Sequence, residues 1–393
     1  MGSILVTGIR ELTTNEGPRL RDAAVVIDGD RFAWVGSAAD APDADERVDA
    51  DGRAALPGWV DSHTHLVFAG DRSAEFESRM AGQPYAAGGI NATVSATRAA
   101  SDDELRAGVA RLVAEARAGG TTALETKTGY GLTVDDEVRS ARIAAEAVDE
   151  VTFLGAHVVP EGADRVEYLE LVTGPMLDAV APWVTAVDVF CERGAFSAEE
   201  SARVLAAATA RGIAAHVHGN QLGHGDGVRI AVEHGALSVD HLGFLTDDDV
   251  EALAATWQGD GRGTVATVLP ACDLSTRMPL APARRLIDAG AVLAIASNCN
   301  PGTSYTSSMA FCVATAVLQM GLTIEEAVRA ATLGGAIALD RHVDRPGRPR
   351  LGVVAPGARA DLQLLDAPSV SHLAYRPGMP LTSAVWRAGV RVV

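Results

Sequence analysis

Apolar and polar positions alternate along the middle of the chain in two different ways. Between residues 57 and 347, short apolar runs bounded by Gly, Pro, Asn or charged residues alternate with longer segments that carry apolar residues at helical spacing. The short runs predict eight buried strands. They contain the segments GWVDSHTH, TTALETKTG, VTFLGAH, AVDVFCE, IAAHVHG, LSVDHL, GTVATVLPA and AVLAIASN.

Helical segments separate most of these strands. Residues 101–119 and 197–212 each begin with a Ser that is followed three residues later by a Glu, and each ends at Gly. This is the capping-box pattern of a helix N-terminus, with Gly as the signal for the C-terminus. Eight strands that alternate with helices predict an α/β fold, a (β/α)8 TIM barrel.

The two ends of the chain are rich in predicted strands and carry few helical patterns. Residues 1–56 and 351–393 consist of short β-rich runs punctuated by Gly, Asp and Asn. Neither end alone has enough strands to bury both faces of a sheet. We therefore predict two domains: a small composite β-sandwich of residues 1–56 and 348–393, and a barrel of residues 57–347.

Side chains that can bind metals or protons gather at the ends of the predicted strands. In a (β/α)8 barrel the active site lies at the C-terminal ends of the strands, so these residues are expected to surround one site. In chain order the strands end in His63 and His65, Lys127, His157, Glu192, His216 and His218, His241, Pro270 and Asn298.

Three of these histidines are candidate metal ligands. His63 and His65 are two residues apart, so on a strand both imidazoles point to the same face. On the fifth strand His218 lies closer to the following loop than His216 and is the better placed third ligand. Three histidines with an open position are typical of a catalytic Zn²⁺ or Fe²⁺ that activates water.

A second ion is not expected. Barrels of this kind that hold two ions bridge them with a modified lysine late on the fourth strand. Here the fourth strand ends in VFCE, and Lys127, the only lysine of the sequence, lies at the second. We therefore predict one metal ion.

Composition excludes several classes of function. The formal net charge of −18 argues strongly against nucleic-acid binding, which needs clustered Lys and Arg. The chain shows neither a signal-peptide pattern nor an apolar stretch of about 20 residues, so we expect no membrane association. The cysteines form no CxxC pair, which favours reduced thiols in a cytoplasmic protein. They are Cys191, Cys272, Cys299 and Cys312.

Seven motifs together resemble the imidazolonepropionases of the amidohydrolase superfamily. The resemblance runs from about Pro57 to beyond Met309, and the two strand-rich ends suit the composite sandwich of that family. It implies hydrolysis of 4-imidazolone-5-propanoate to N-formimidoyl-L-glutamate, the third step of histidine degradation. The motifs are LPGWVDSHTHLVFAGDR, ETKTGYGL, TFLGAHVVP, DVFCERGAFS, VHGNQLG, DHLGFL and NPGTS.

The resemblance also implies roles for individual residues. Arg72 suits the substrate propionate, because guanidinium groups bind carboxylates in a bidentate manner. His157 and His241 are candidates for polarising the ring carbonyl and for relaying a proton. Metal ligands are implied at His63, His65, His218 and Asn298. Substrate contacts are implied at Arg72, Tyr85, Tyr130, His157 and Gln221, with His241, Asn300, Gly302 and Thr303 completing the site, and Gln221 and Asn298 are further candidates for catalysis.

Asn298 departs from the family pattern, which has an aspartate that contacts the metal and transfers a proton. The amide oxygen of asparagine coordinates weakly and is not a usable base, so another group must transfer the proton. Three alternatives follow. The chain is a native variant that uses His241, with Asp240 or Glu233 nearby, as the base. Or it is an engineered form in which asparagine replaces the aspartate to slow turnover and trap substrate, or a site that binds ligand without much catalysis.

Other functions remain as alternatives to this interpretation. Another cyclic amidohydrolase, or a guanine or cytosine deaminase, also uses the HxH pattern. Such a function would not explain why an arginine and a KTGYG loop are directed at a propionate. A metal-binding or ligand-binding protein without catalysis is favoured only by Asn298. Three histidines do not distinguish Zn²⁺ from Fe²⁺ or Fe³⁺. The family resemblance implies a homodimer.

Overall fold

The computed structural model describes residues 2–83, 89–259 and 261–393. The chain forms two compact units, and each is described by itself. One unit contains Met1–Asp61, Ala114–Ala123 and Ser308–Val393, and the other contains Ser62–Val113 and Leu124–Ser307. The domain limits expected from the sequence, near residues 56 and 348, remain a prediction.

Eight strands form one sheet in the order β13-β12-β11-β10-β9-β8-β7-β6. The neighbours from β7 to β13 pair in parallel, as expected where a helix connects successive strands. The eight strands coincide with those predicted from the sequence, which confirms the α/β barrel class. They are β6 (Trp59–Asp61), β7 (Thr121–Lys127), β8 (Glu150–Ala156), β9 (Ala186–Cys191), β10 (Ala214–Gly219), β11 (Ser238–His241), β12 (Val265–Val268) and β13 (Leu293–Ile295).

The first and last segments of this sheet meet just beyond their strands. The backbone N–H of Asn298 donates to the carbonyl of His63, and that of His65 donates to the carbonyl of Cys299, each at 2.9 Å. Thr64 and Cys299 form a parallel bridge. These bonds close the barrel at the C-terminal ends of the strands, where they fix two predicted metal ligands beside Asn298.

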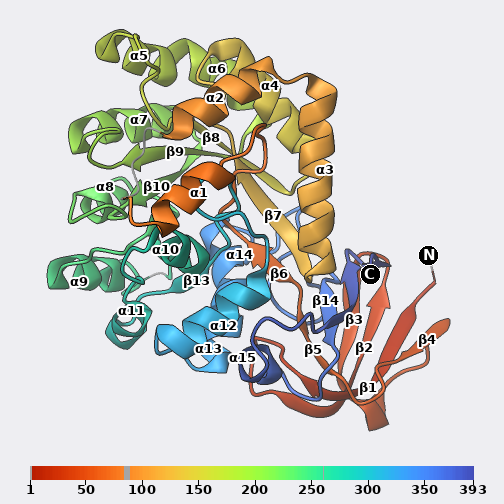
Figure 1. The fold of residues 1–393 in the computed structure, drawn as a ribbon. Helices are drawn as coiled ribbons and strands as arrows, with labels where there is room; N and C mark the ends of the chain where they lie inside the picture. The colour runs from red at the N-terminus through yellow and green to blue at the C-terminus, as the bar shows by residue number, and fades with distance from the viewer. Residues whose placement is uncertain (1, 84–88, 260) are drawn as a thin grey trace. The chain divides into compact units, whose positions relative to one another are not determined.

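Helices alternate with the strands around the sheet (Figure 1). The predicted capping boxes are present: Ser101 and Glu104 bond reciprocally before α3, and Ser197 and Glu200 do so at α7. The unit of Ser62–Val113 and Leu124–Ser307 contains the following helices, of which α3 extends into the other unit. They are α1 (Ser73–Met80), α2 (Ile90–Ala99), α3 (Asp102–Ala118), α4 (Val134–Ala145), α5 (Arg165–Leu171), α6 (Leu177–Val180), α7 (Ala198–Ala210), α8 (Gly227–Glu233), α9 (Asp247–Ala255), α10 (Pro270–Thr276) and α11 (Ala283–Ala289), with short helical turns at η3 (Val172–Met176) and η4 (Ala181–Trp183).

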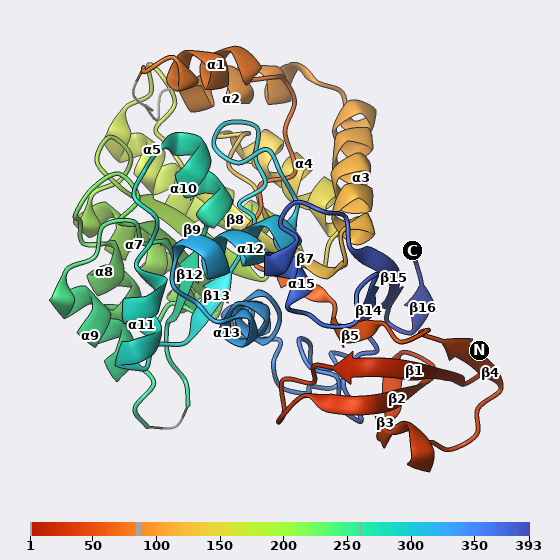
Figure 2. The same ribbon diagram turned by 60° about the horizontal axis from the view of Figure 1, so that its bottom comes forward.

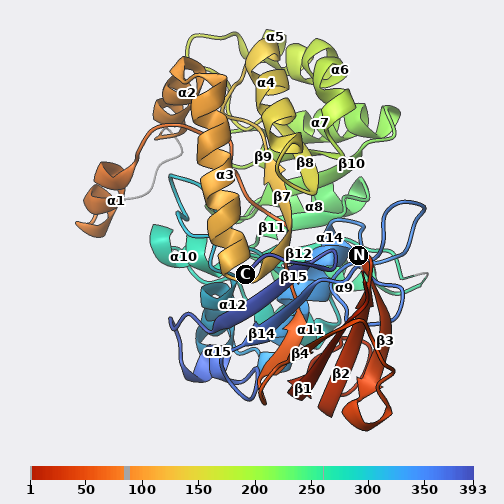
Figure 3. The same ribbon diagram turned by 90° about the vertical axis from the view of Figure 1, so that its right-hand side faces the viewer.

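The other unit contains a separate sheet built from both ends of the chain. Figure 2 shows β1, β2 and β3 side by side, and Figure 3 shows β14 next to β15. The N-terminal strand β5 pairs antiparallel with the C-terminal strand β14, as the predicted composite arrangement requires. The strands, in the order β16-β15-β14-β5-β1-β2-β3 with β4 on β1, are β1 (Ile4–Leu12), β2 (Leu20–Asp28), β3 (Arg31–Ser37), β4 (Glu46–Asp49), β5 (Ala54–Pro57), β14 (Leu362–Leu365), β15 (Thr382–Arg387) and β16 (Val390–Arg391).

Apolar side chains from both ends of the chain form one core against this sheet. Ile9, Phe32 and Trp386 are almost completely buried in it. The sheet is therefore stabilised by residues more than 350 positions apart in sequence, such as Phe32 and Trp386. Helical segments of this unit are η1 (Ala38–Asp40), α12 (Met309–Gln319), α13 (Ile324–Arg329), η5 (Ala330–Gly334), α14 (Gly335–Ala338) and α15 (His372–Tyr375).

Within the described residues, every helix is too short or too polar to cross a lipid bilayer.

Candidate active site

Three buried histidines form the centre of the site. His63 and His65 lie just beyond β6, and His218 lies on β10. One nitrogen from each ring lies within 4.8 Å of one nitrogen from each of the others. His216 does not belong to this group of three, and its Nδ1 contacts the Ser238 hydroxyl at 2.9 Å. The structure thus brings together the three histidines that were predicted as metal ligands.

The geometry of the three rings fits one metal ion. The Nε2 atoms of His63 and His65 are 3.3 Å apart. Two nitrogen ligands that each bind a tetrahedral ion at about 2.0–2.1 Å should lie about 3.3–3.4 Å from each other. The observed spacing therefore allows both nitrogens to bind one ion at normal bond lengths. Burial lowers the pKa of His63 and of His65 well below 6.5, which keeps both imidazoles neutral and able to coordinate.

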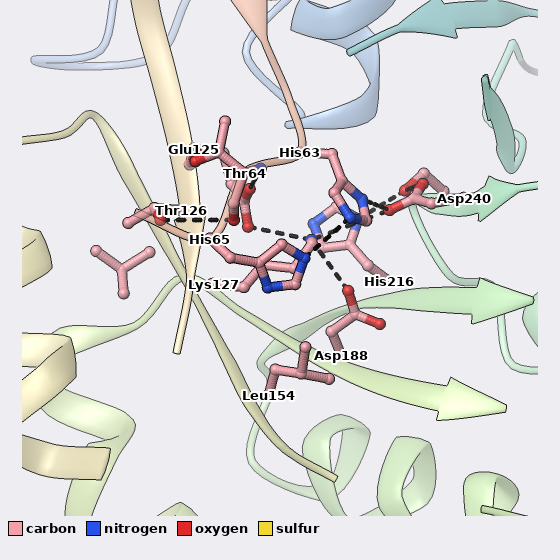
Figure 4. A network of polar contacts seen from close by, with 12 residues as sticks. His63, Thr64, His65, Glu125, Thr126, Lys127, Leu154, Asp188, His216 and Asp240 are labelled. Atoms are coloured by element: carbon pink, nitrogen blue, oxygen red, sulfur yellow. Dashed lines mark hydrogen bonds and ion pairs between the residues drawn. The ribbon is translucent and has the colours of Figure 1, made fainter. Parts of the chain in front are cut away.

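Two buried aspartates hold the outward-facing nitrogens of these ligands. Nδ1 of His63 lies 2.6 Å from Asp240 Oδ2, and Nδ1 of His218 lies 3.0 Å from Asp188 Oδ2 (Figure 4 shows the first pair). The Asp240 carboxylate accepts from His63, which keeps the proton on Nδ1 of that ring and leaves Nε2 free for a metal. Sequence reasoning missed the role of Asp188. It placed Asp240 beside His241, whereas the structure places its carboxylate on His63.

Most of the predicted substrate-binding residues line one pocket with the metal-ligand candidates. Tyr85 lies outside the described residues, and Gly302 forms part of the neighbouring loop. Ile90 and Phe190 are additional apolar lining residues that sequence reasoning missed. The pocket is lined by His65, Arg72, Ile90, Tyr130, His157, Phe190, His218, Gln221, His241, Asn298, Asn300 and Thr303.

Arg72 reaches this pocket with part of its guanidinium already bound. Its Nε and Nη2 donate to the two carboxylate oxygens of Glu75, at 2.9 and 2.7 Å. A methyl group built on Gly302 would lie 2.2 Å from Nη1 of Arg72. Glycine at position 302 therefore leaves room for the guanidinium, and Nη1 is the nitrogen that faces this loop.

The loop that carries Tyr130 is held by a buried carboxylate. Glu137 accepts hydrogen bonds from the backbone N–H groups of Gly129, Gly131 and Leu132, at 3.0, 2.8 and 2.7 Å. The Tyr130 ring lies 5.4 Å from the His157 ring, centroid to centroid. Glu137 thus positions the KTGYG loop, a role that its place inside a helix did not reveal from the sequence.

His157 has a defined orientation. Its Nδ1 lies 3.0 Å from the carbonyl oxygen of Gly129, which can only accept, so Nδ1 carries the proton and Nε2 has a free lone pair. Burial lowers the pKa of His157 to about 4. The imidazole is therefore neutral near pH 7 and can accept a proton at Nε2.

His241 ends β11 with a left-handed backbone, at a φ of 86°. Such a conformation costs about 1–3 kcal/mol for most residues and is common at functional sites. Its Nδ1 lies 4.0 Å from the Cys272 thiol, which also receives a hydrogen bond from Gln221 at 3.8 Å. Burial raises the pKa of Cys272 to about 12, so the thiol stays protonated. Cys272 was expected only to be a buried thiol.

Asn298 also has a left-handed backbone, with a φ of 52°, which asparagine tolerates well. Its Oδ1 accepts a hydrogen bond from Asn300 Nδ2 at 3.2 Å. Asn300 Oδ1 in turn accepts from the N–H groups of Gly302 and Thr303, both at 2.8 Å. Asn300 therefore organises the loop, and its side chain is largely committed there.

Glu233 was the second acidic residue that the sequence suggested, after Asp240, as a neighbour of a histidine base. In the structure it is exposed and pairs with Arg229.

Solved structures with this fold include metal-bound hydrolases. An adenosine deaminase from Xanthomonas campestris with bound zinc superposes with a TM-score of 0.72 at 20% identity, covering 99% of this chain and 92% of that one. An atrazine chlorohydrolase from Arthrobacter aurescens TC1, complexed with zinc, gives 0.72 at 20% identity, covering 99% and 95%. At such low identity the likeness supports the fold alone.

Sequence relatives are far more similar. The amidohydrolase family model matches residues 54–392. An imidazolonepropionase from Paenarthrobacter aurescens (strain TC1) is 64% identical, covering 100% of this chain and 98% of the relative. One from Saccharopolyspora erythraea is also 64% identical, covering 100% and 99%. These matches confirm the resemblance drawn from the motifs. The chain therefore belongs to the amidohydrolase family and, within it, to the imidazolonepropionases.

Proposed function

We propose that this chain hydrolyses the cyclic amide C–N bond of 4-imidazolone-5-propanoate to give N-formimidoyl-L-glutamate. One water molecule is added and one ring C–N bond is broken, so the product contains all atoms of both reactants. The observation that carries the proposal is the pocket itself. It joins two of the three clustered histidines to a buried arginine suited to a carboxylate.

We propose that His63, His65 and His218 hold one divalent ion, Zn²⁺ or iron, with Asn298 as a weak neutral neighbour. When bound, such an ion lowers the pKa of water and polarises a carbonyl oxygen. All three imidazoles and the amide of Asn298 are uncharged ligands. Asp240 and Asp188 contact His63 and His218 and are not among the residues that line the pocket, so they support the ligands from behind.

Arg72 binds the propionate in this proposal. Its Nη1 is the nitrogen that faces the Gly302 loop, while Glu75 holds the opposite edge of the guanidinium. A substrate carboxylate can bind at Nη1 beside Glu75, or take the place of Glu75 in the bidentate pair. Tyr130, held by its Glu137-bound loop, is placed to donate a hydrogen bond to the carboxylate or the ring.

His157 takes the proton from the attacking water at Nε2 and delivers it to the ring nitrogen that leaves. The carbonyl of Gly129 fixes the tautomer that this role requires. His241 donates from Nε2 to the ring carbonyl as negative charge develops on its oxygen. A thiol proton donated from Cys272 to Nδ1 of His241 favours that tautomer. Gln221 orients the ring through its neutral amide.

We further propose a cytoplasmic homodimer. The four cysteines are buried and form no disulfide, as is typical of a reducing compartment. The dimer rests on the family resemblance, and light scattering of the purified protein tests it.

Elemental analysis and substrate decay on one sample test the main proposal. The expected result is about one equivalent of zinc or iron per chain, together with loss of the absorbance of 4-imidazolone-5-propanoate. A parallel panel of hydantoins, guanine and cytosine should show no comparable turnover. Bound metal without loss of imidazolone, or faster turnover of a purine or pyrimidine, would refute the assigned reaction.

A further inference from the structure

A buried lysine lies behind the three histidines. Lys127 ends β7 and is completely buried, although lysine is among the residues least often found inside proteins. Its Nζ lies 3.1 Å from Glu125, 3.0 Å from Asp188 and 3.9 Å from Asp240 (Figure 4). One ammonium group therefore contacts three buried carboxyl groups that come from three different strands.

Each of these carboxyl groups leads to a different part of the histidine cluster. Asp240 contacts Nδ1 of His63, and Asp188 contacts Nδ1 of His218. Glu125 accepts from the backbone N–H of Thr64 at 3.1 Å, and Thr64 lies between His63 and His65. His63 and His218 are thus each linked to the same ammonium group through one carboxyl group, and the backbone between His63 and His65 is linked to it through Glu125.

We propose that Lys127 is the positioning residue of the metal centre: it fixes the rings of His63 and His218 through Asp240 and Asp188, and the backbone that carries His63 and His65 through Glu125. The inference rests on the proposed metal site but does not depend on the substrate. A carboxylate that orients a metal-binding histidine is commonly worth 10–100-fold in metal affinity. Here one side chain holds several such groups at once.

The charges of this cluster are mutually dependent. Two or three carboxylates in a buried space repel one another, and an unpaired buried charge is strongly destabilising. Burial alone would lower the pKa of Lys127, but Glu125, Asp188 and Asp240 together raise it above its usual range. Asp188 lies between this ammonium group and Nδ1 of His218, at 3.0 Å from each, so the cation holds Asp188 in place beside the histidine.

Replacement of Lys127 by methionine separates positioning from simple electrostatics. Removing a positive charge near a metal cation should tighten metal binding if the Coulomb energy alone mattered. Loss of ligand orientation should weaken it. We expect Lys127→Met to raise the dissociation constant of Co²⁺ about 10–100-fold and to alter the visible absorption bands of the Co²⁺-loaded protein. Unchanged or tighter binding with unchanged bands would overturn the proposal.

A double-mutant cycle tests the route through the carboxylates. If Lys127 acts partly through Asp188, Lys127→Met should weaken Co²⁺ binding by a smaller factor in an Asp188→Asn background than in the wild type. Equal factors in both backgrounds would contradict this route. Should Lys127→Met fail to fold, Lys127→Gln retains a polar group, and the same direction is expected in its Co²⁺ titration.

Arg359 provides a matched control for loss of a buried cation. Arg359 pairs with Asp361 at 2.6 Å and donates to the carbonyl of Thr122, and all three residues belong to the unit built from the chain ends. Arg359→Met should lower the Tm of the metal-free protein and leave the Co²⁺ bands intact. Identical spectral changes in both variants would overturn the proposal. Because the readout is metal binding, a failure of imidazolone hydrolysis with intact Co²⁺ bands would refute only the assigned reaction.

Discussion

Asp240 uses both carboxylate oxygens to fix His63. Oδ2 lies 2.6 Å from Nδ1 of the imidazole, and Oδ1 accepts a hydrogen bond from the Ser238 hydroxyl, also at 2.6 Å. The aspartate is therefore held from its far side while it orients the ring. The predicted ligand atom Nε2 points away from this contact and toward His65.

Replacement of Asp240 by alanine should weaken metal binding about 10–100-fold, because the His63 ring loses its acceptor. Competition of Zn²⁺ between the protein and a chromophoric chelator measures this directly. Asp288→Ala is the control, since Asp288 is exposed and pairs with Arg284 one helical turn away. Equal affinity in the Asp240 and Asp288 variants would show that the contact does not support the ligand.

Replacement of Asn298 by aspartate should increase turnover and tighten metal binding. The carboxylate adds a negative charge and a proton acceptor to the pocket, and proton transfer is typically worth about 10²–10⁴-fold. Both residue types tolerate the left-handed backbone at this position. Steady-state kinetics measure kcat. Asn298→Gly, which keeps the backbone conformation without a side chain, should show no gain, and an equal gain there would argue against the carboxylate as the cause.

Replacement of Arg72 by methionine should act on substrate binding. A hydrogen bond to a charged group is worth about 1.5–3 kcal/mol, which corresponds to about 10–150-fold. We expect this factor mainly in KM for 4-imidazolone-5-propanoate. A substrate analogue without the propionate should bind wild type and variant equally well. A fall in kcat at constant KM would instead assign Arg72 to the chemical step.

Replacement of Gly129 by alanine should loosen the Tyr130 loop. Gly129 has a φ of 105°, and a methyl group there would lie 2.6 Å from the carbonyl oxygen of Leu154. Gly162→Ala is the control, since Gly162 has a φ of 80° with no atom within 4 Å of the new methyl group. Backbone strain, about 1–3 kcal/mol, is common to both. A larger loss of Tm in Gly129→Ala than in the control, measured calorimetrically, would reveal the added clash.

Stability should fall as the pH rises because of Asp273. Burial raises the pKa of this carboxyl from 3.8 to about 8. Between these values the folded state keeps the proton that the unfolded state releases, so the free energy of unfolding decreases with rising pH until about pH 8. Asp273→Asn should flatten this part of the profile, as followed by urea unfolding. The same slope in wild type and variant would exclude Asp273 as its cause.

Much of the barrel could be predicted because its strands are short, apolar and bounded by clear signals. The rule that barrel sites lie at the C-terminal ends of strands then selected His65, His157, His218 and His241, which do line one pocket. This rule uses only local sequence and strand order. It therefore works for side chains that extend directly into the site.

Residues that act from behind the site were harder to predict. Asp188 lies in the middle of β9, and Asp240 adjoins a more conspicuous histidine, so the rule for strand ends missed one and misplaced the other. Their partners are 30 and 177 positions away in sequence, at His218 and His63. The one local signal was a carboxylate inside an otherwise apolar strand, where burial requires a partner.

Lys127 has a practical consequence for chemical modification of this protein. It is the only lysine of the sequence, and its ammonium group is fully buried. Reagents that acylate amines have no exposed lysine side chain to attack among the residues described. Acylation of Lys127 therefore requires the interior of the barrel to open, so its rate under native conditions reports the frequency of that opening without any engineered label.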